Sequence, residues 1–221
     1  MKMIKSCIFD LDGTLLNTLP TIRHYVNLTL SEFGLGSVSE KDVKRMVGNG
    51  SKKLIERALL KNGASLEDFE KIHKFYSDSY DEDVTYLTHT YDGIPELLAE
   101  LKTMGIKIAV LSNKPDFAAK EAVKTFLGDL VDVTYGARDD VPLKPSPDGV
   151  FQIMEELGVK EEESFFIGDS SVDMKTGKNS GLFTIGVEWG FRDEDELIQN
   201  GADKIVSSPE MICDIINSRQ K

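Results

Sequence analysis

The sequence predicts an α/β fold, in which a doubly wound parallel sheet is interrupted by one inserted, all-helical subdomain. Two observations support this prediction. From about residue 90 onward, strand and helix patterns alternate, as in parallel sheets that helices cover on both faces. Between the first strand and that region, residues 17–89 show helical patterns and no convincing strand. We therefore expect a discontinuous core of residues 1–16 and 90–221 and a helical subdomain of residues 17–89.

The first strand is the short apolar run Cys7–Phe9, which is followed by Asp10, Asp12 and a Gly13–Thr14 turn. Side chains two residues apart on a strand share a face, so Asp10 and Asp12 should project together. They would do so at the carboxyl end of the strand, where open α/β sheets bind ligands. Two close carboxylates repel unless a cation or a shared proton lies between them. The pattern suits a magnesium-assisted acyl-phosphate chemistry, and the alternative is an Asp-Gly turn that carries a second Asp.

The inserted subdomain is indicated by four consecutive helical patterns. They cover residues 22–33, 40–46, 52–60 and 66–80. A helical block of this length between the first strand and the later alternation is typical of an insertion into an α/β fold. We expect its hinges near Asn17 and Tyr91.

The rest of the chain alternates between strands and helices, with Gly and Pro marking helix ends. A helix over residues 94–104 stops at Gly105 and precedes a strand at 106–111, and a further helix opens at Pro147 and stops before Gly158. The other predicted helices cover residues 116–126, 172–180, 194–199 and 209–217. The other predicted strands cover residues 131–135, 164–167, 183–187 and 204–206.

Composition describes an ordinary globular protein of one large or two small domains, with 221 residues, 40% hydrophobic and 29% charged. The sequence contains no run of eighteen apolar residues, so it predicts no transmembrane helix. Asp10 interrupts the first apolar stretch too early for a secretory signal. Cys7 and Cys213 show no paired spacing, which favours a reduced cytoplasm. The three histidines lack the spacing of zinc ligands.

The formal net charge of −12, from 26 basic and 38 acidic residues, limits the possible partners. Non-specific binding to nucleic acid or to an acidic membrane needs a positive field, so we expect neither. An anionic substrate stays possible. It would require locally placed lysines, backbone N–H groups or a metal ion to overcome the field of the whole protein.

Three further polar signals lie at predicted strand ends. Ser112 and Asn113 follow the strand that ends at residue 111, Lys144 lies in a proline-rich loop, and Asp169 and Asp173 follow the strand that ends at residue 167. Each alone has a plain structural alternative: a helix cap, a solvated lysine or a Gly-Asp-Ser turn. Because the carboxyl ends of parallel strands meet at one edge of the sheet, the three signals together predict a single site.

With these motifs in this order, the sequence resembles the haloacid dehalogenase-like superfamily of phosphatases. The resemblance covers essentially the whole chain and implies a Rossmann-like core, because the helical insertion resembles the cap domain of that family. Within the superfamily the chain is most similar to the phosphoglycolate phosphatase-like group, on the segments 48–50 and 187–190. The chain departs from many relatives at Asn17, where they carry Asp, at a hinge position rather than a catalytic one.

The resemblance implies the chemical roles of three aspartates. Asp10 corresponds to the nucleophile that becomes an aspartyl-phosphate, which divides the barrier to hydrolysis into two smaller ones. Asp12 corresponds to the general acid for the leaving alcohol and then to the base for the hydrolytic water. A carboxylate oxygen of Asp10, the backbone carbonyl of Asp12, and Asp169 would hold Mg²⁺, which prefers such oxygen ligands.

The resemblance also implies the groups that surround the phosphate. Ser112 and Asn113 would donate hydrogen bonds to the phosphoryl oxygens, and Lys144 would stabilise the charge of the aspartyl-phosphate and its transition state. Asp173 would orient Lys144 or a metal-bound water, with an exposed helix-surface Asp as the alternative. Thr14 would either contact the nucleophile or cap the following segment.

A glycine-rich segment of the insertion is a candidate substrate-binding element, and it consists of Gly48, Asn49 and Gly50. We expect a helix to begin at Ser51. The N–H groups at its start, with Lys52 or Lys53, would then hold an anionic group of the substrate. The alternative is a glycine turn with Ser51 as an N-cap, and Arg45 is either a further cation of this site or a solvated charge.

We therefore expect a cytoplasmic, Mg²⁺-dependent phosphomonoesterase, monomeric or homodimeric, that acts on a small phosphorylated metabolite, with 2-phosphoglycolate as the lead candidate. A β-phosphoglucomutase-like phosphomutase uses the same motifs and is the main alternative. A pyrophosphatase or nucleotidase also fits the family, whereas a dehalogenase needs neither Asp12 nor magnesium. A non-enzymatic phospho-acceptor module would be better served without Asp12, because that group promotes hydrolysis.

Overall fold

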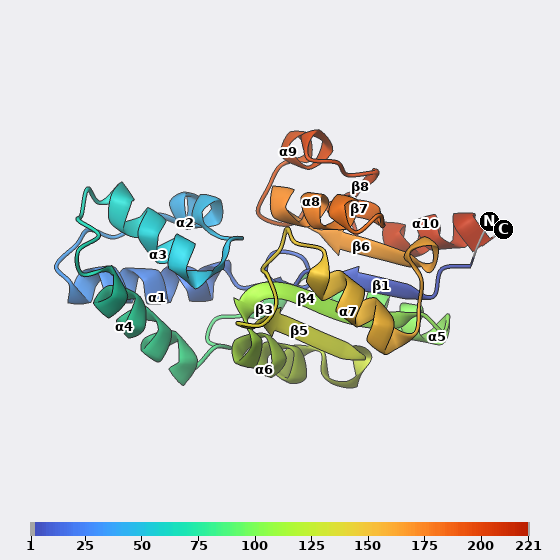
Figure 1. Cartoon of the computed structure of the whole chain (residues 1–221), viewed down its shortest axis with the longest axis horizontal. Coiled ribbons are helices and arrows are strands. Elements are labelled where there is room, and N and C mark those ends of the chain that lie inside the picture. The colour runs from blue at the N-terminus through green and yellow to red at the C-terminus, as the bar shows by residue number, and fades with distance from the viewer. Residues whose placement is uncertain (1–2, 221) are drawn as a thin grey trace.

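The computed structural model describes residues 3–220, which form a six-stranded sheet with helices on both faces and a separate group of four helices at one end (Figure 1). The strand order is β5-β4-β1-β6-β7-β8, and every neighbouring pair is parallel. This architecture confirms the predicted doubly wound α/β fold. It also places the first strand in the middle of the sheet, between β4 and β6.

The sheet and its helices come from residues 6–9 and from the region after residue 90. The strands are β1 (Ser6–Phe9), β4 (Lys107–Pro115), β5 (Val133–Ala137), β6 (Ser164–Gly168), β7 (Phe183–Val187) and β8 (Lys204–Val206). The helices are α5 (Ile94–Thr103), α6 (Asp116–Phe126), α7 (Asp148–Leu157), α8 (Ser171–Asn179), α9 (Glu194–Gln199) and α10 (Glu210–Gln220), with short 3₁₀ turns at Gly128–Leu130 and Glu161–Glu163.

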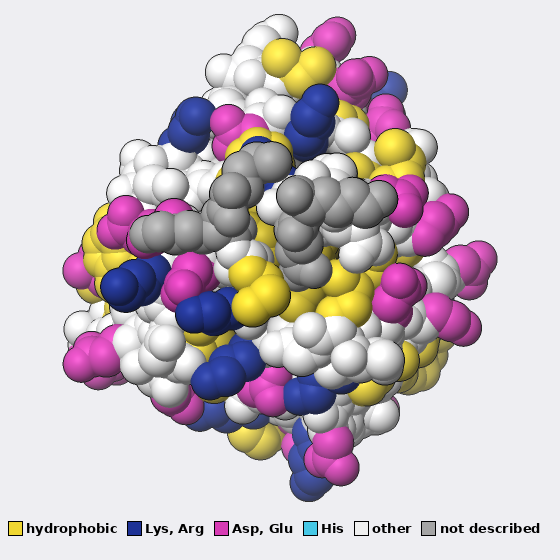
Figure 2. Space-filling view, turned by 90° about the vertical axis from the view of Figure 1, so that its right-hand side faces the viewer, with side chains coloured by type: hydrophobic (Ala, Val, Ile, Leu, Met, Phe, Trp, Pro, Cys, Tyr) yellow, Lys and Arg dark blue, Asp and Glu magenta, His cyan; other side chains and the backbone are white. Residues whose placement is uncertain are grey.

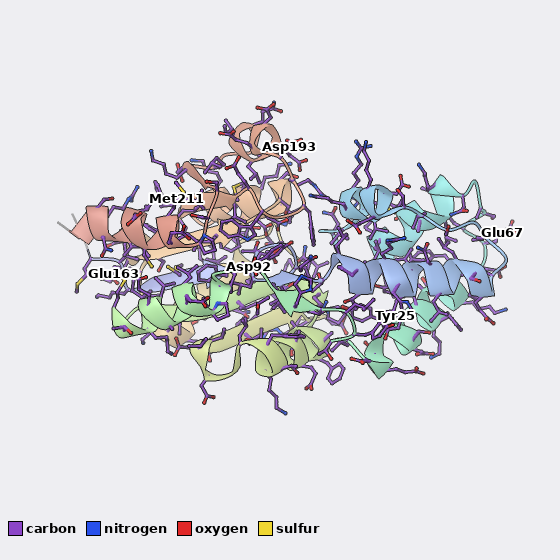
Figure 3. The ribbon with its side chains drawn as sticks, turned by 180° about the vertical axis from the view of Figure 1, so that it is seen from behind. Tyr25, Glu67, Asp92, Glu163, Asp193 and Met211 are labelled. Carbon is purple, nitrogen blue, oxygen red and sulfur yellow. The ribbon has the colours of Figure 1, made fainter. Side chains whose placement is uncertain are left out.

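The central strand β1 is buried on both faces, as is typical of parallel sheets. Cys7 and Phe9 pack in one hydrophobic cluster with side chains of α5, α6 and α10. These helices cover the face of the sheet that is turned away from the viewer in Figure 1 and toward the viewer in Figure 3. Ile8 points to the opposite face and packs with side chains of α7. Strand β1 therefore holds the residues that follow it in a fixed position at the centre of the protein.

The four helices between β1 and α5 form a second hydrophobic cluster, and we call residues 19–82 the helical insertion. They are α1 (Leu19–Glu32), α2 (Glu40–Met46), α3 (Gly50–Lys61) and α4 (Phe69–Glu82). Tyr25 and Glu67, labelled in Figure 3, lie in this part of the chain. Buried side chains such as Val26, Ile55 and Leu59 fill the centre of the cluster. Apolar periodicity at these positions is the signal that predicted the helices.

The insertion leaves and re-enters the core through a small antiparallel ladder that the sequence did not predict. Strand β2 (Leu16–Asn17) pairs with β3 (His89–Thr90), and Asn17 Nδ2 lies 3.4 Å from His89 Nε2. The expectation that residues 17–89 contain no strand was wrong, because Asn17 and His89 each lie in one. Two-residue strands are too short to show an alternating pattern, so only the fold reveals them.

Strand β4 is longer than predicted, and this matters for the site. It extends to Pro115 rather than ending at Leu111, and its register against β5 shifts between these two residues. Ser112 and Asn113 therefore lie within the last part of the strand rather than after it. By contrast, the bounds of α2, α6, β7, α9 and β8 coincide with the predicted ones.

The outer surface carries both signs of charge. At the end opposite the helical insertion, Lys and Arg side chains are interspersed with Asp and Glu (Figure 2). Within residues 3–220, no helix is both long and apolar enough to span a bilayer.

Candidate active site

The candidate site is a cavity of about 120 Å³ between the carboxyl ends of the central strands and the helical insertion. Asp10 follows β1, and its backbone N–H donates to Ile167 O of the neighbouring strand at 2.8 Å. The core lines the cavity with Asp10, Asp12, Ser112, Asn113, Lys114, Lys144, Asp169, Asp173, Phe191 and Arg192, among others. The insertion contributes Ile22, Gly48, Gly50, Ser51, Leu54, Tyr76 and Tyr80, among others.

Lys144 connects two of the predicted site residues. Its Nζ donates to Asp10 Oδ1 at 2.6 Å and to Asp173 Oδ1 at 2.7 Å, and its side chain is only 3% exposed. Burial opposes the charged ammonium, but the charges of Asp10 and Asp173 outweigh burial and raise the pKa of Lys144. Lys144 is therefore a fixed positive charge beside Asp10.

Asp173 is fixed by the start of α8. Its Oδ2 accepts hydrogen bonds from the backbone N–H of Ser170 at 3.0 Å and from Ser170 Oγ at 2.6 Å, in a capping box at the helix N-terminus. Its other oxygen faces Lys144. The alternative that Asp173 is an exposed helix-surface residue was wrong, because the residue is 1% exposed.

Asp169 is held by two donors from different loops. Thr14 Oγ1 donates to its Oδ1 at 3.2 Å, and the backbone N–H of Phe191 donates to its Oδ2 at 2.6 Å. Thr14 thus contacts Asp169 rather than Asp10, because the turn after β1 lies against the end of β6. Burial, followed by the charge of Asp173, raises the pKa of Asp169 to about 7.

Two glycines allow the backbone to approach Asp169 closely. A Cβ atom on Gly13 would lie 2.4 Å from Asp169 Oδ2, and one on Gly190 would lie 2.3 Å from Asp169 Cβ. Gly13 also has a positive φ of 96°, which side chains rarely adopt. Any larger residue at either position would displace the Asp169 carboxylate.

The aspartates form a cluster that fits a hard cation. One carboxylate oxygen each from Asp10, Asp169 and Asp173 lies within 4.8 Å of the others. Burial and then the charge of Asp173 raise the pKa of Asp10 well above its usual range. Three buried carboxylates with one ammonium leave uncompensated negative charge, which a divalent cation with oxygen ligands would relieve.

The members of this cluster differ from the predicted ligand set. The sequence predicted the carboxylates of Asp10 and Asp169 together with the backbone carbonyl of Asp12, and the structure adds the carboxylate of Asp173 to the first two. Both oxygens of Asp173 already accept hydrogen bonds from Lys144 and Ser170. Both oxygens of Asp169 likewise accept hydrogen bonds, from Thr14 and Phe191, so these hydrogen bonds do not distinguish Asp169 from Asp173 as a metal ligand.

Lys114 is a site residue that sequence reasoning missed. Its Nζ lies 3.1 Å from Asp12 Oδ1 and within hydrogen-bond distance of the Tyr80 hydroxyl of α4. The prediction ended the strand at Leu111 and began the next helix at residue 116, so Lys114 lay in neither element. Had the strand been extended, the two-residue spacing from Ser112 would have placed both side chains on the same face.

Ser112 and Asn113 differ in what their side chains can do. Ser112 lines the cavity, and its Oγ accepts from the backbone N–H of Lys114 at 3.2 Å, which leaves its hydroxyl proton to donate. The Asn113 amide instead donates to Gly48 O and Lys144 O, each at 3.0 Å, and accepts from Lys144 N at 2.8 Å. Asn113 therefore ties the insertion to the loop that carries Lys144.

The glycine-rich segment contributes only part of what was predicted. Gly48 and Gly50 line the cavity, and α3 begins at Gly50 rather than Ser51. Asn49 Oδ1 accepts from Arg57 Nη2 at 2.7 Å and lies at a neighbouring cavity instead. Ser51 is not an N-cap, and its hydroxyl lies 3.0 Å from His73 Nε2.

The basic residues near this segment are also directed elsewhere. Lys53 is exposed and pairs with Glu56 at 2.5 Å. Arg45 is exposed and lines the neighbouring cavity rather than the main one.

The loop after β7 joins the core site to the insertion. Trp189 Nε1 donates to Thr14 O at 2.9 Å, and the guanidinium of Arg192 donates to the carbonyls of Lys44 and Val47 at the end of α2. The Phe191 side chain packs in the hydrophobic cluster of the insertion, while its N–H holds Asp169. This loop therefore both joins the two regions and holds Asp169.

Comparisons with known proteins identify the family of the chain. The profile of the haloacid dehalogenase-like hydrolase family matches residues 7–187. An N-acetylmuramic acid 6-phosphate phosphatase of Pseudomonas aeruginosa is 32% identical, over 97% of this chain and 95% of that protein. A phosphoglycolate phosphatase of Vibrio parahaemolyticus is 30% identical over 96% of each chain. The crystal structure of a predicted phosphoglycolate phosphatase from Haemophilus somnus has a TM-score of 0.90 at 27% identity, and the match covers 97% of this chain and 99% of that one.

Proposed function

The chain belongs to the haloacid dehalogenase-like hydrolase family and is a phosphatase, and on this basis we propose that it hydrolyses phosphomonoesters through an aspartyl-phosphate on Asp10. The observation that carries the proposal is the buried cluster of Asp10, Lys144, Asp169 and Asp173 at the strand ends. Such a cluster combines a nucleophile, a fixed positive charge and oxygen ligands for a metal.

In this proposal Asp10 attacks the phosphorus atom, and Lys144 stabilises the negative charge that the transferring phosphoryl group carries. Asp173 positions Lys144 through the 2.7 Å contact. Asp10, Asp169 and the backbone carbonyl of Asp12 would hold Mg²⁺, which supplies charge that offsets the repulsion between a carboxylate and a phosphate dianion. Thr14 positions Asp169.

Asp12 acts as the acid and then the base of the reaction. It donates a proton to the oxygen of the leaving alcohol and later accepts a proton from the water that hydrolyses the aspartyl-phosphate. The Ser112 hydroxyl donates to a phosphoryl oxygen. Because the Asn113 amide is already engaged with Gly48 and Lys144, this side chain positions the Lys144 loop rather than binding phosphate.

We propose that residues 17–89 act as a cap over a core of residues 1–16 and 90–221. Gly48 and Gly50 line the cavity from the insertion side, and Gly48 O accepts from Asn113 across the boundary. Closure of such a cap would exclude water and hold the ester against Asp10. Asn49 has no part in this, because its side chain faces Arg57.

The lead candidate substrate is 2-phosphoglycolate, a small ester that suits a cavity of about 120 Å³. The name of the Vibrio parahaemolyticus relative supports it. N-acetylmuramic acid 6-phosphate is the second candidate, supported by the Pseudomonas aeruginosa relative. Within the described residues both cysteines are buried and unpaired, which supports a reduced cytoplasm as the site of action.

The test is phosphate release from both candidates and from glucose 1-phosphate, with Mg²⁺ and with a chelator. We expect metal-dependent release with one substrate far ahead, and loss of release in Asp10→Asn. Isomerised sugar phosphate without free phosphate would favour the phosphomutase alternative. Full activity of Asp10→Asn would contradict the proposed nucleophile.

A further inference from the structure

Lys114 is a buried cation at the boundary between the core site and the helical insertion. Its side chain is 4% exposed. Its Nζ lies 3.1 Å from Asp12 Oδ1, within hydrogen-bond distance of the Tyr80 hydroxyl, and 4.8 Å from the centre of the Tyr80 ring. A buried charge is costly unless it is paired, so a lysine kept here needs a specific partner or ligand.

The contacts that Lys114 makes in the described chain leave room for a ligand on its ammonium group. An ammonium has three N–H donors, and Asp12 and Tyr80 account for two of them in the described chain. Lys114 also lines the cavity. An anionic group in the cavity could therefore accept the third hydrogen bond and share the charge.

The other two basic side chains that line this cavity in the described chain are committed elsewhere. Lys144 is shared between Asp10 and Asp173 at the proposed phosphate position. Arg192 donates to two backbone carbonyls and lies 3.4 Å from Glu196. Lys114 is the remaining cation, and it lies beside Asp12 rather than beside Asp10.

This position faces the leaving group of the substrate. In the proposed function, Asp12 delivers a proton to the ester oxygen of the leaving alcohol, so the atoms attached to that oxygen lie next to Asp12. Lys114 contacts the same carboxylate. A substituent one carbon away from the ester oxygen would therefore come within reach of the ammonium.

The rest of this side of the cavity does not favour a charged substituent. Ile22, Leu54 and Tyr76 line it from the insertion, and all three are buried. Asp81 also lines it and would repel an anion. A leaving group that carries negative charge would need a cation here, because apolar and aromatic surfaces do not compensate a desolvated charge. Lys114 supplies that cation.

We propose that Lys114 is a specificity-determining residue that binds a carboxylate carried by the leaving alcohol, one carbon from the ester oxygen. This inference rests on the proposed function and adds to it the residue that selects the leaving group. A charge-assisted hydrogen bond from Lys114 to such a carboxylate would discriminate against neutral analogues of the same size.

A matched pair of substrates tests the inference. 2-Phosphoglycolate and 2-hydroxyethyl phosphate differ only in a carboxylate against a hydroxymethyl group. We expect wild-type kcat/KM to favour 2-phosphoglycolate by roughly 30-fold, as for hydrogen bonds to charged groups. In Lys114→Met the ratio should fall below about threefold, mainly through a higher KM for 2-phosphoglycolate, and Lys114→Arg should restore part of it.

The matched control is Lys120→Met, which removes an exposed lysine of α6 that pairs with Asp116 and should keep the full ratio. If Lys114→Met does not fold, wild-type inhibition by glycolate but not by ethylene glycol tests the same contact. A wild-type chain without the preference, or a Lys114→Met variant that keeps it, would overturn the inference. Hydrolysis of p-nitrophenyl phosphate reports on the proposed function separately. If the protein hydrolyses this ester but does not prefer 2-phosphoglycolate over 2-hydroxyethyl phosphate, only the inference about Lys114 is overturned. If it hydrolyses none of the three esters, the proposed function is overturned as well.

Discussion

The core and the helical insertion contribute different kinds of surface to the same cavity. The core provides charged groups, each held by more than one buried contact: Lys144 has two carboxylate partners, and Asp169 has two donors. The insertion provides apolar and aromatic side chains, such as Leu54 and Tyr76, together with two glycines, two serines and Asp81. A buried network with fixed partners is rigid, whereas an apolar wall can change shape without breaking hydrogen bonds.

The two regions are joined by only a few polar contacts. Asn113 donates to Gly48 O, Arg192 to the end of α2, and Lys114 to Tyr80. The difference teaches that chemistry and selectivity are separated in space. Lys114, a core residue at the boundary, is proposed to act on KM. Apart from it, changes in the core should act on kcat, and changes in the insertion should act on KM. The following predictions test this separation, from the largest expected effect to the smallest.

The largest effect is expected for Asp10→Asn in the core. Loss of the nucleophile should lower kcat by roughly 10³-fold or more. Removal of one of three crowded carboxylates should at the same time leave the chain folded and raise its melting temperature. Phosphate release and thermal denaturation on one preparation measure both. A variant that is inactive because it is unfolded would not support the separation.

The next effect is expected for Gly190→Ala, which acts on the core without removing a polar group. The new Cβ would lie 2.3 Å from Asp169 Cβ, so the carboxylate must move. Since shifts in supporting groups cost roughly 10- to 100-fold in metal affinity, we expect the Mg²⁺ concentration for half-maximal activity to rise by that factor. The control is Gly36→Ala in the insertion, where the added Cβ would meet only Oδ1 of Asn62, at 3.1 Å. This variant should leave the Mg²⁺ concentration for half-maximal activity unchanged.

A smaller effect is expected for Arg57→Ala in the insertion. Arg57 holds Met46 O at 2.6 Å and Asn49 Oδ1 at 2.7 Å, and so fixes the segment that lines the cavity. Its loss should raise KM by roughly tenfold, the cost of about one charged hydrogen bond, and change kcat by less than threefold. Lys61→Ala, an exposed residue at the end of the same helix, is the control. A fall in kcat equal to the rise in KM would contradict the separation.

The smallest effect concerns stability against pH in the presence of a chelator. The pKa of Asp169 is raised to about 7, so between pH 4 and pH 7 the folded chain binds more protons than the unfolded chain. Stability should therefore fall as pH rises through this window. We expect a drop of roughly a few degrees in melting temperature. Mg²⁺ should stabilise the chain more at pH 8 than at pH 5, and Asp169→Asn should flatten the profile.

Much of the fold and part of the site follow from local patterns. The apolar run before Asp10 predicted β1, and the apolar spacing at positions such as Val26 and Leu59 predicted the helices of the insertion. The rule that ligands bind at the carboxyl ends of parallel strands predicted that Asp10, Lys144 and Asp169 would meet. These predictions needed only apolar periodicity and the rule for strand ends.

The parts that failed depend on contacts between distant segments. Thr14 bonds to Asp169 because β1 and β6 are neighbours, and the Asn113 amide is taken up by Gly48 and Lys144. Lys114 becomes a site residue only because β4 continues past its register shift. Nothing in the spacing of these residues along the chain carries that information.

The short ladder of β2 and β3 has a consequence for how this fold can be altered. Because Leu16 pairs with Thr90 and Asn17 with His89, the two points where the insertion joins the core are neighbours in space. A segment of any length whose own ends lie together could be grafted there without changing the register of the six-stranded sheet. The ladder thus brings both junctions of the insertion to one point of the core, and a replacement segment would also have to supply the carbonyl of Gly48 to which Asn113 donates beside Lys144.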